Sequence, residues 1–202
     1  MKKIKVQNYA SFSPIENGEK KYKIITSVDG QELGIEVKGT VTSFLDENFN
    51  EMKFDKKAYD KCISEYFEKN DLNIPIDLMH VRDGFHLLGV CTKFKKTSSG
   101  VEIVTFIPKG VYFYGLVKTL IDNGILQGFS NMGFITDYSY EEEQDIFIVK
   151  EFQLISISLV DVPADVSGKF ATQNTIFEGF ENQESKTETK TETKNNLSIF
   201  GI

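Results

Sequence analysis

Short runs in which apolar and polar residues alternate dominate the chain, and this is the pattern of half-buried β-strands. Turn-forming residues such as Asp29-Gly30 separate several of the runs, and the polar stretch 141–145 has the composition of a hairpin tip. The strands predicted in this way cover residues 22–28, 35–44, 87–94, 101–107, 126–138, 146–149 and 153–160. The pattern therefore predicts a mainly β chain.

Two segments instead carry the apolar spacing of amphipathic helices. The first begins near Asp55, a favourable N-cap residue, and the second covers residues 111–122 and stops at Asn123-Gly124. The predicted buried positions are Tyr59, Cys62, Ile63, Tyr66 and Phe67 in the first and Phe113, Leu116, Val117, Leu120 and Ile121 in the second. Together with the strands, these helices predict the α+β class.

Composition narrows the class of function. The 202 residues suffice for one domain with a sizeable core, and the formal net charge of −7 argues against direct, broad binding to nucleic acid. No stretch is apolar and long enough for a membrane span. Cys62 and Cys91 lie far apart and in no metal-like spacing, so we interpret them as buried thiols in a reducing compartment. These features predict a cytosolic protein.

The two ends of the chain differ from its middle. We expect residues 1–20 to form an N-terminal extension and residues 21–180 to form the folded domain. Residues 181–196 contain no apolar residue and repeat Lys-Thr-Glu-Thr, which predicts a disordered linker. Residues 197–202 form a short apolar tag, which is either a frayed end or a peptide that docks on a partner or on the protein's own cleft.

The candidate chemistry involves one serine and one histidine. A serine becomes a good nucleophile when a base takes its proton, and histidine is the side chain best suited to this at neutral pH. His80 follows an apolar run, and Ser130 lies between Gly128 and Gly133, whose small size allows close backbone approach. A core histidine and an ordinary strand serine remain the structural alternative at this point.

A second constellation has metal-ligand residue types at a spacing of three. It consists of Asp77, His80, Asp83 and His86. Pro75 before it and Gly84 within it argue against a helix that would place these side chains on one face. A metal-dependent hydrolase using these four residues is therefore an alternative.

The order of three segments resembles the prohead (capsid maturation) proteases of tailed phages, which share a fold with the herpesvirus assemblins. The segments are Met79-His80 followed by Leu88-Gly89-Val90, then Gly128-Phe-Ser130-Asn-Met-Gly-Phe134, then Ser156-Ile-Ser-Leu-Val160 with Pro163-Ala-Asp165. The resemblance covers roughly residues 37–166, and its specificity comes from the order and spacing of the segments together.

The resemblance implies an antiparallel β-barrel with peripheral helices and a serine endopeptidase that needs no cofactor. Its substrates would be scaffold and capsid proteins, and in some cases itself, inside the assembling prohead in the host cytoplasm; self-association is left open. Ser130 would be the nucleophile, His80 the general base and Ser156 the residue that orients the base. Backbone N–H groups around residues 162–164 would hold the oxyanion.

One departure from the family concerns the orienting acid. The family has a Glu where this chain has Ser156, and a hydroxyl can hold the imidazole tautomer but cannot stabilise its positive charge. Glu151 or Asp83 are candidate substitute acids, while Asp161 faces away from Ser156 by strand alternation. On this basis Ser156→Glu should raise or preserve activity. The alternative is a capsid-assembly or scaffold-like protein that kept the fold and lost catalysis.

Overall fold

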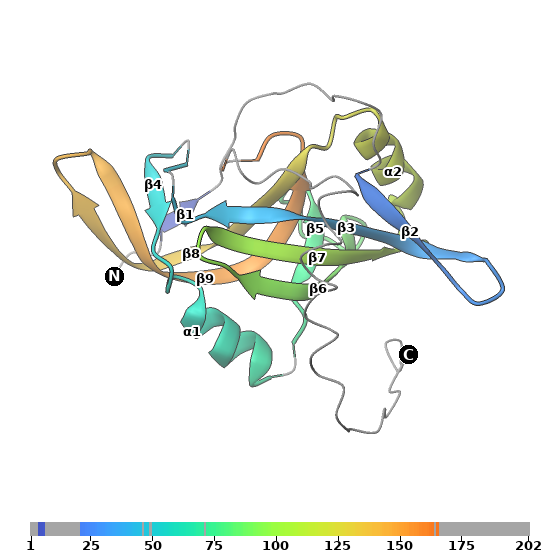
Figure 1. Ribbon diagram of the computed structural model, residues 1–202, viewed down its shortest axis with the longest axis horizontal. Helices are drawn as coiled ribbons and strands as arrows, with labels where there is room; N and C mark the ends of the chain where they lie inside the picture. Colours follow the sequence, from blue (N-terminus) through green and yellow to red (C-terminus); the bar gives the residue numbers. More distant parts are fainter. Residues whose placement is uncertain are drawn as a thin grey trace.

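Strands make up most of the computed structural model, which describes residues 4–6, 21–45, 47–48, 50–70, 72–163 and 165. Its helical segments are α1 (Asp60–Cys62), which continues into the π-helical turn η1 (Ile63–Glu68), and α2 (Tyr114–Asp122). Both pack outside the strands (Figure 1). The predicted α+β class is confirmed, while the linker 181–196 and the apolar tag lie outside the described residues.

The described strands form one sheet. Its hydrogen-bonded order is β1-β8-β9-β5-β6-β7-β3-β2, and β4 pairs with β9 off this path. The strands are β1 (Ile4–Val6), β2 (Tyr22–Thr26), β3 (Glu32–Ser43), β4 (Met52–Phe54), β5 (Pro75–Leu78), β6 (Leu87–Lys96), β7 (Gly100–Pro108), β8 (Gly128–Glu141) and β9 (Ile146–Val160). Strand β9 lies antiparallel to its chain neighbour β8 and parallel to β5, so β5, which is distant in sequence, lies beside the β8–β9 hairpin.

The described strands are not closed into a hydrogen-bonded barrel, because β1 and β2 are the two ends of the path. The sheet nevertheless folds over itself, and Figure 1 shows β3, β7 and β6 crossing over β8 and β9. Asn131 on β8 donates hydrogen bonds to Thr42 Oγ1 on β3 at 2.7 Å and to Tyr59 Oη at 2.8 Å. The predicted closed barrel is therefore unconfirmed.

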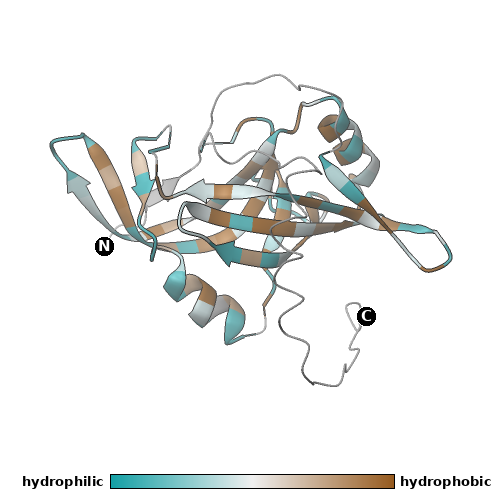
Figure 2. Cartoon of the chain, viewed as in Figure 1, coloured by the Kyte–Doolittle hydropathy of each residue, from teal (hydrophilic) through white to brown (hydrophobic). Residues whose placement is uncertain are grey.

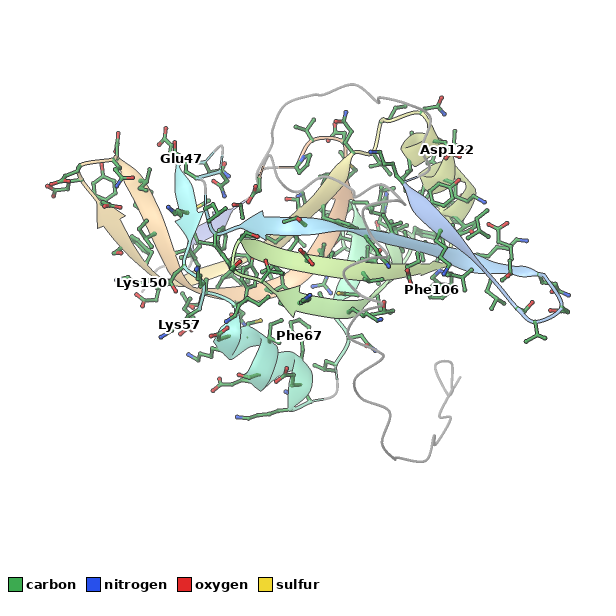
Figure 3. All side chains as sticks on the ribbon, in the orientation of Figure 1. Glu47, Lys57, Phe67, Phe106, Asp122 and Lys150 are labelled. Atoms are coloured by element: carbon green, nitrogen blue, oxygen red, sulfur yellow. The ribbon has the colours of Figure 1, made fainter. Side chains whose placement is uncertain are left out.

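A single apolar core fills the space between the crossing strands (Figures 2 and 3). The rings of Phe54, Tyr59 and Phe152 meet there, with centroids 5.3 to 5.6 Å apart. Cys62 and Cys91 are buried free thiols, and burial raises the pKa of Cys91 to about 12. Both cysteines thus contribute to the core as small apolar side chains.

The first helix differs from its prediction at its start. Asp55 accepts a hydrogen bond from the backbone N–H of Lys57 at 2.8 Å, and the chain makes a turn before α1 begins at Asp60. Asp55 therefore caps a turn and not the helix itself. The predicted apolar stripe is confirmed at Tyr59, Cys62 and Phe67, which are all buried.

The second helix begins three residues later than predicted, and a partly different set of its side chains is buried. Tyr114, Val117 and Ile121 are buried, whereas Leu116 is 46% exposed. The predicted stop is confirmed, because Gly124 has φ +67°, a value that favours glycine. None of the described helices combines the length and apolar character needed to cross a membrane.

Two strand predictions also need correction. The segments predicted at 146–149 and 153–160 form one continuous strand, β9, because β8 pairs along its whole length. Strands β1, β4 and β5 were not predicted; each has only three or four residues, too few to display a period. Strand β1 brings residues 4–6 of the expected N-terminal extension into the sheet beside β8.

Candidate active site

Three neighbouring strands bring the predicted site residues together. Ser130 on β8 is the register partner of Ser158 on β9, and Asp77 on β5 is the partner of Ser158 on the other side. Residues directly opposite on antiparallel strands share a face, with Cβ atoms about 4.5–5.5 Å apart. Ser130, Ser158 and Asp77 therefore form a row across the sheet.

The row is polar but almost completely buried. The exposed fraction is 3% for Ser130 and 0% for both Ser158 and Asp77. Their neighbours along the strands, Phe129 and Ile157, belong to the apolar core, as alternation along a strand requires. One face of these strands thus packs the core, and the other presents hydroxyls and a carboxylate.

His80 reaches this polar face from a strained turn at the end of β5. Met79 and His80 both have positive φ, +55° and +61°, and the N–H of Val81 donates to the carbonyl of Leu78 at 3.1 Å. Positive φ at both central residues is the geometry of a two-residue type I′ loop, which usually contains Asn or Gly. Strain of this kind concentrates at functional sites.

The ring of His80 is held through one hydroxyl. His80 Nδ1 lies 2.8 Å from Ser158 Oγ, and Ser158 Oγ donates a short hydrogen bond to Asp77 Oδ1. Ser156 Oγ donates to the other carboxylate oxygen of Asp77 at 2.6 Å. The carboxylate therefore connects to the imidazole through Ser158 and is fixed from its other side by Ser156.

The opposite nitrogen of the ring is available for proton transfer. His80 Nε2 is buried and has no hydrogen-bond partner among the described residues. Burial lowers the pKa of His80 below its ordinary value of 6.5, and the charge of Asp77 partly opposes this effect. The ring is thus neutral at physiological pH and can accept a proton, as a general base must.

The structure changes the role that the resemblance suggested for Ser156, that of orienting the ring of His80. Ser158, not Ser156, contacts His80, and Ser156 contacts Asp77. Two signals in the sequence pointed to the residues that were missed: Asp77 is a lone charge in the apolar run before His80, and Ser158 lies two residues from Ser156 and so shares its strand face.

Neither predicted substitute acid contacts the ring. Glu151 forms an ion pair with Lys61 at 2.9 Å and accepts a hydrogen bond from Thr136. Asp83 pairs with Nδ1 of the other histidine, His86, at 2.7 Å. Both carboxylates are engaged elsewhere, so these two suggestions are wrong.

The candidate metal ligands separate into two groups. Asp77 and His80 converge on Ser158, whereas Asp83 and His86 bind each other near the surface. Within the described ranges, no three His, Cys, Asp or Glu side chains come close enough to hold a metal ion. The residues of the metal alternative therefore do not form one site.

The predicted oxyanion donors are only partly described. The N–H of Val162 donates to the side chain of Asp161 at 2.8 Å, Pro163 has no N–H, and Ala164 lies outside the described residues. Val162 is thus engaged in this structure.

A pocket of about 270 Å³ lies elsewhere, between the first helix and β9, where Lys61, Glu65, Glu151 and Gln153 line it.

The sequence and the fold resemble those of phage head-maturation proteases. The chain is 34% identical over 84 residues to the prohead protease of Escherichia phage T5, covering 41% of this chain and 39% of that protein. It is 36% identical over 70 residues to a probable capsid maturation protease of Lactococcus phage p2, covering 35% of this chain and 38% of that protein. The chain spans about two fifths of the length of these curated relatives.

A solved structure extends the likeness to most of the fold. The capsid assembly protease of bacteriophage T4 matches with a TM-score of 0.56 and 16% identity, covering 72% of this chain and 92% of that one. At this identity the likeness concerns the fold alone. No family model matches the chain. The resemblance to phage prohead proteases predicted from the sequence is confirmed.

Proposed function

We propose that this protein is a serine endopeptidase that cleaves scaffold and capsid proteins, and itself, during maturation of a phage head. The relatives named prohead protease and capsid maturation protease support this class of activity. The observation that carries the assignment is the position of Ser130, directly opposite the residue that holds the ring of His80. A serine nucleophile on β8 and a histidine base on the turn after β5 need no cofactor for peptide hydrolysis.

The reaction follows from the two side chains. Ser130 Oγ attacks the carbonyl carbon of the scissile peptide, and the hydroxyl proton passes to His80 Nε2. The protonated ring then gives this proton to the leaving amine, so that the peptide C–N bond breaks and an acyl-serine remains. Water, deprotonated by the same nitrogen, hydrolyses the acyl-serine and restores both side chains.

Ser130 is a better nucleophile than Ser158, although Ser158 lies in contact with the ring. The Ser158 proton is donated to Asp77, and its oxygen is occupied by His80 Nδ1. The hydroxyl of Ser130 has no hydrogen-bond partner among the described residues, so its proton is free to move to a base. Ser130 is therefore the nucleophile in this proposal, and Ser158 is not.

The proposed place of action is the inside of the assembling prohead in the host cytoplasm. The substrates would be the capsid and scaffold proteins that surround the enzyme there. The net charge of −7 disfavours direct binding to the packaged nucleic acid. Self-association of the enzyme stays open in this proposal.

A catalytically inactive assembly protein on the same fold is the second candidate. The observation that favours it is that His80 Nδ1 lies against the uncharged hydroxyl of Ser158 and not against a carboxylate. Without a carboxylate in direct contact with the ring, the imidazolium formed during the reaction would be stabilised less. The two candidates differ in one measurable property, the reactivity of Ser130.

A fluorophosphonate probe tests the proposal, with the modified residue located by peptide mass spectrometry on the full chain. We expect labelling at Ser130 in the wild type, loss of labelling in Ser130→Ala and strong reduction in His80→Asn. Ser139→Ala on the same strand is the matched control and should label normally. An unlabelled wild type would support the inactive assembly protein, and a label on Ser158 would overturn the choice of nucleophile.

A further inference from the structure

Asp77 is a buried carboxylate that the predicted Ser–His chemistry does not include. Its exposed fraction is 0%, and its described hydrogen bonds come from two hydroxyls, those of Ser156 and Ser158. No Lys or Arg of the described residues forms an ion pair with it. Burying a carboxylate without a cation is costly, and such groups are rare unless they are used.

We propose that Asp77 is the acid of this site and acts on the base His80 through the hydroxyl of Ser158. The inference rests on the proposed peptidase function for its catalytic meaning. Asp77 and Ser158 touch no reacting atom and are positioning residues. Ser156 supports the carboxylate from the far side and is not itself the residue that orients the ring.

The number of available protons fixes the direction of the hydrogen bonds that join His80, Ser158 and Asp77. Ser158 has one hydroxyl proton, and because an ionised carboxylate can only accept, this proton is donated to Asp77. The oxygen of Ser158 must then accept the hydrogen bond from His80, so the ring proton is on Nδ1. The lone pair is left on Nε2, the buried nitrogen that has no described partner.

The same hydrogen bonds account for a serine at position 156, where the resemblance to prohead proteases predicts a glutamate. Position 156 on β9 and position 77 on β5 lie on neighbouring strands, and their side chains meet at 2.6 Å. A glutamate at 156 would place its carboxylate in the space that Asp77 now fills. In this chain the negative charge lies on β5, and Ser156 and Ser158 are its hydrogen-bond donors.

The charge environment of His80 makes Asp77 the dominant partner. Asp77 on β5 is the charged group that acts on the ring among the described residues. Strand β9 presents the uncharged hydroxyl of Ser158 to the ring. After the turn, Asp83 forms an ion pair with His86. Removing the charge of Asp77 should therefore change the titration of His80.

An NMR titration of the imidazole groups tests this without requiring activity, because the chain has two histidines and His86 serves as the internal reference. We expect the wild-type His80 ring to carry its proton on Nδ1. Asp77→Asn, which keeps the shape, should lower the pKa of His80, and Ser158→Ala should remove the preference for Nδ1–H. Asp83→Asn is the matched control and should leave the pKa and the tautomer of His80 unchanged.

Labelling of Ser130 by the fluorophosphonate probe provides the second readout. The rate should fall about 100-fold in Asp77→Asn and in Ser158→Ala at pH 7. An unchanged His80 pKa in Asp77→Asn together with an unchanged tautomer in Ser158→Ala would overturn the inference. If both NMR changes occur but the wild type never labels, the peptidase assignment fails and the control of the ring by Asp77 stands. If one variant does not fold, the other decides.

Discussion

The backbone N–H of Met79 donates a hydrogen bond to the carbonyl of Leu159 at 3.0 Å. This contact ties the turn that carries His80 to β9, next to Ser158. The turn has positive φ at two consecutive residues that are not glycine, which costs roughly 1–2 kcal/mol for each. The strain is tolerated because the strands on both sides fix the backbone, and it directs the ring of His80 at the hydroxyls.

Relief of this strain at Met79 should stabilise the fold. Met79 is 40% exposed and has φ +55°, so replacing it with Asn, which tolerates positive φ, loses little apolar burial. We expect Met79→Asn to raise the free energy of unfolding by about 0.5–1 kcal/mol in urea titration. Met79→Ala is the control, since alanine has no polar side chain that could stabilise positive φ by a local hydrogen bond. Equal stability of the two variants would contradict the explanation.

Gly133 controls the pairing of β8 with β9 near the site. A Cβ at this position would lie 2.3 Å from the backbone oxygen of Gln153 and 2.6 Å from the ring of Phe152. A backbone atom in a paired strand cannot move aside, so Gly133→Ala should cost about 1–3 kcal/mol and slow the labelling of Ser130. The measurements are thermal unfolding and probe kinetics.

Gly115 in α2 provides the matched control for that substitution. Nothing lies within 4 Å of a Cβ built at Gly115, and alanine has the higher helix propensity. Gly115→Ala should therefore stabilise the protein by up to about 1 kcal/mol and leave labelling unchanged. Equal destabilisation by the two substitutions would show that the close contact at Gly133 is not the cause.

The sequence predicted the long strands and singled out His80 and Ser130, which stay the proposed base and nucleophile, but it did not associate Asp77 with them. Alternation over β6, β7 and β8 gives a clear period, and the order of His80, Ser130 and Ser156 allowed comparison with a known family. Strand β5 has four residues and runs parallel to β9, a pairing made between segments nearly eighty residues apart. No local pattern reports such a pairing, so Asp77 could not be placed against Ser156 and Ser158 before the fold was known.

The pKa of His80 should make stability fall on mild acidification. Burial lowers this pKa in the folded state below the unfolded value of 6.5, so the unfolded chain binds the proton more tightly. The folding stability that depends on a neutral His80 ring is fully present above pH 6.5 and is lost as the pH falls through the pKa of His80 in the folded state. His80→Asn, which tolerates positive φ, should flatten the thermal midpoint between about pH 5 and 7. A midpoint with the same pH dependence in both proteins would contradict this.

The pH dependence of labelling should follow the same group. Only the neutral ring can take the proton of Ser130, so the labelling rate should rise with pH and level off above the pKa of His80. Because burial lowers that pKa, the midpoint of the rise should lie below 6.5. Asp77→Asn should move the midpoint to still lower pH, since the charge of Asp77 raises the pKa. A midpoint above 6.5 would mean that another group is the base.

The last prediction concerns exchange of the acid between β5 and β9. The sequence alone predicts that Ser156→Glu raises or preserves activity, but the structure places Asp77 2.6 Å from Ser156 Oγ in a fully buried site. Two carboxylates there would repel each other and overfill the space. We therefore expect the single substitution to destabilise the fold by about 3 kcal/mol or more and to reduce labelling.

The double variant Asp77→Ser with Ser156→Glu moves the charge to position 156, where the resemblance to prohead proteases predicts a glutamate. Asp77→Ser alone should also lose labelling of Ser130, whereas the double variant should regain much of the wild-type labelling rate. The effects of the two substitutions on this rate would then be strongly non-additive. Asp77→Ser with Ser156→Gln keeps the shape of the pair without its charge and should stay slow. Recovery in the Gln pair would assign the effect to packing. Failure of the Glu pair to recover, in a protein that folds, would show that the site does not accept its acid from either strand.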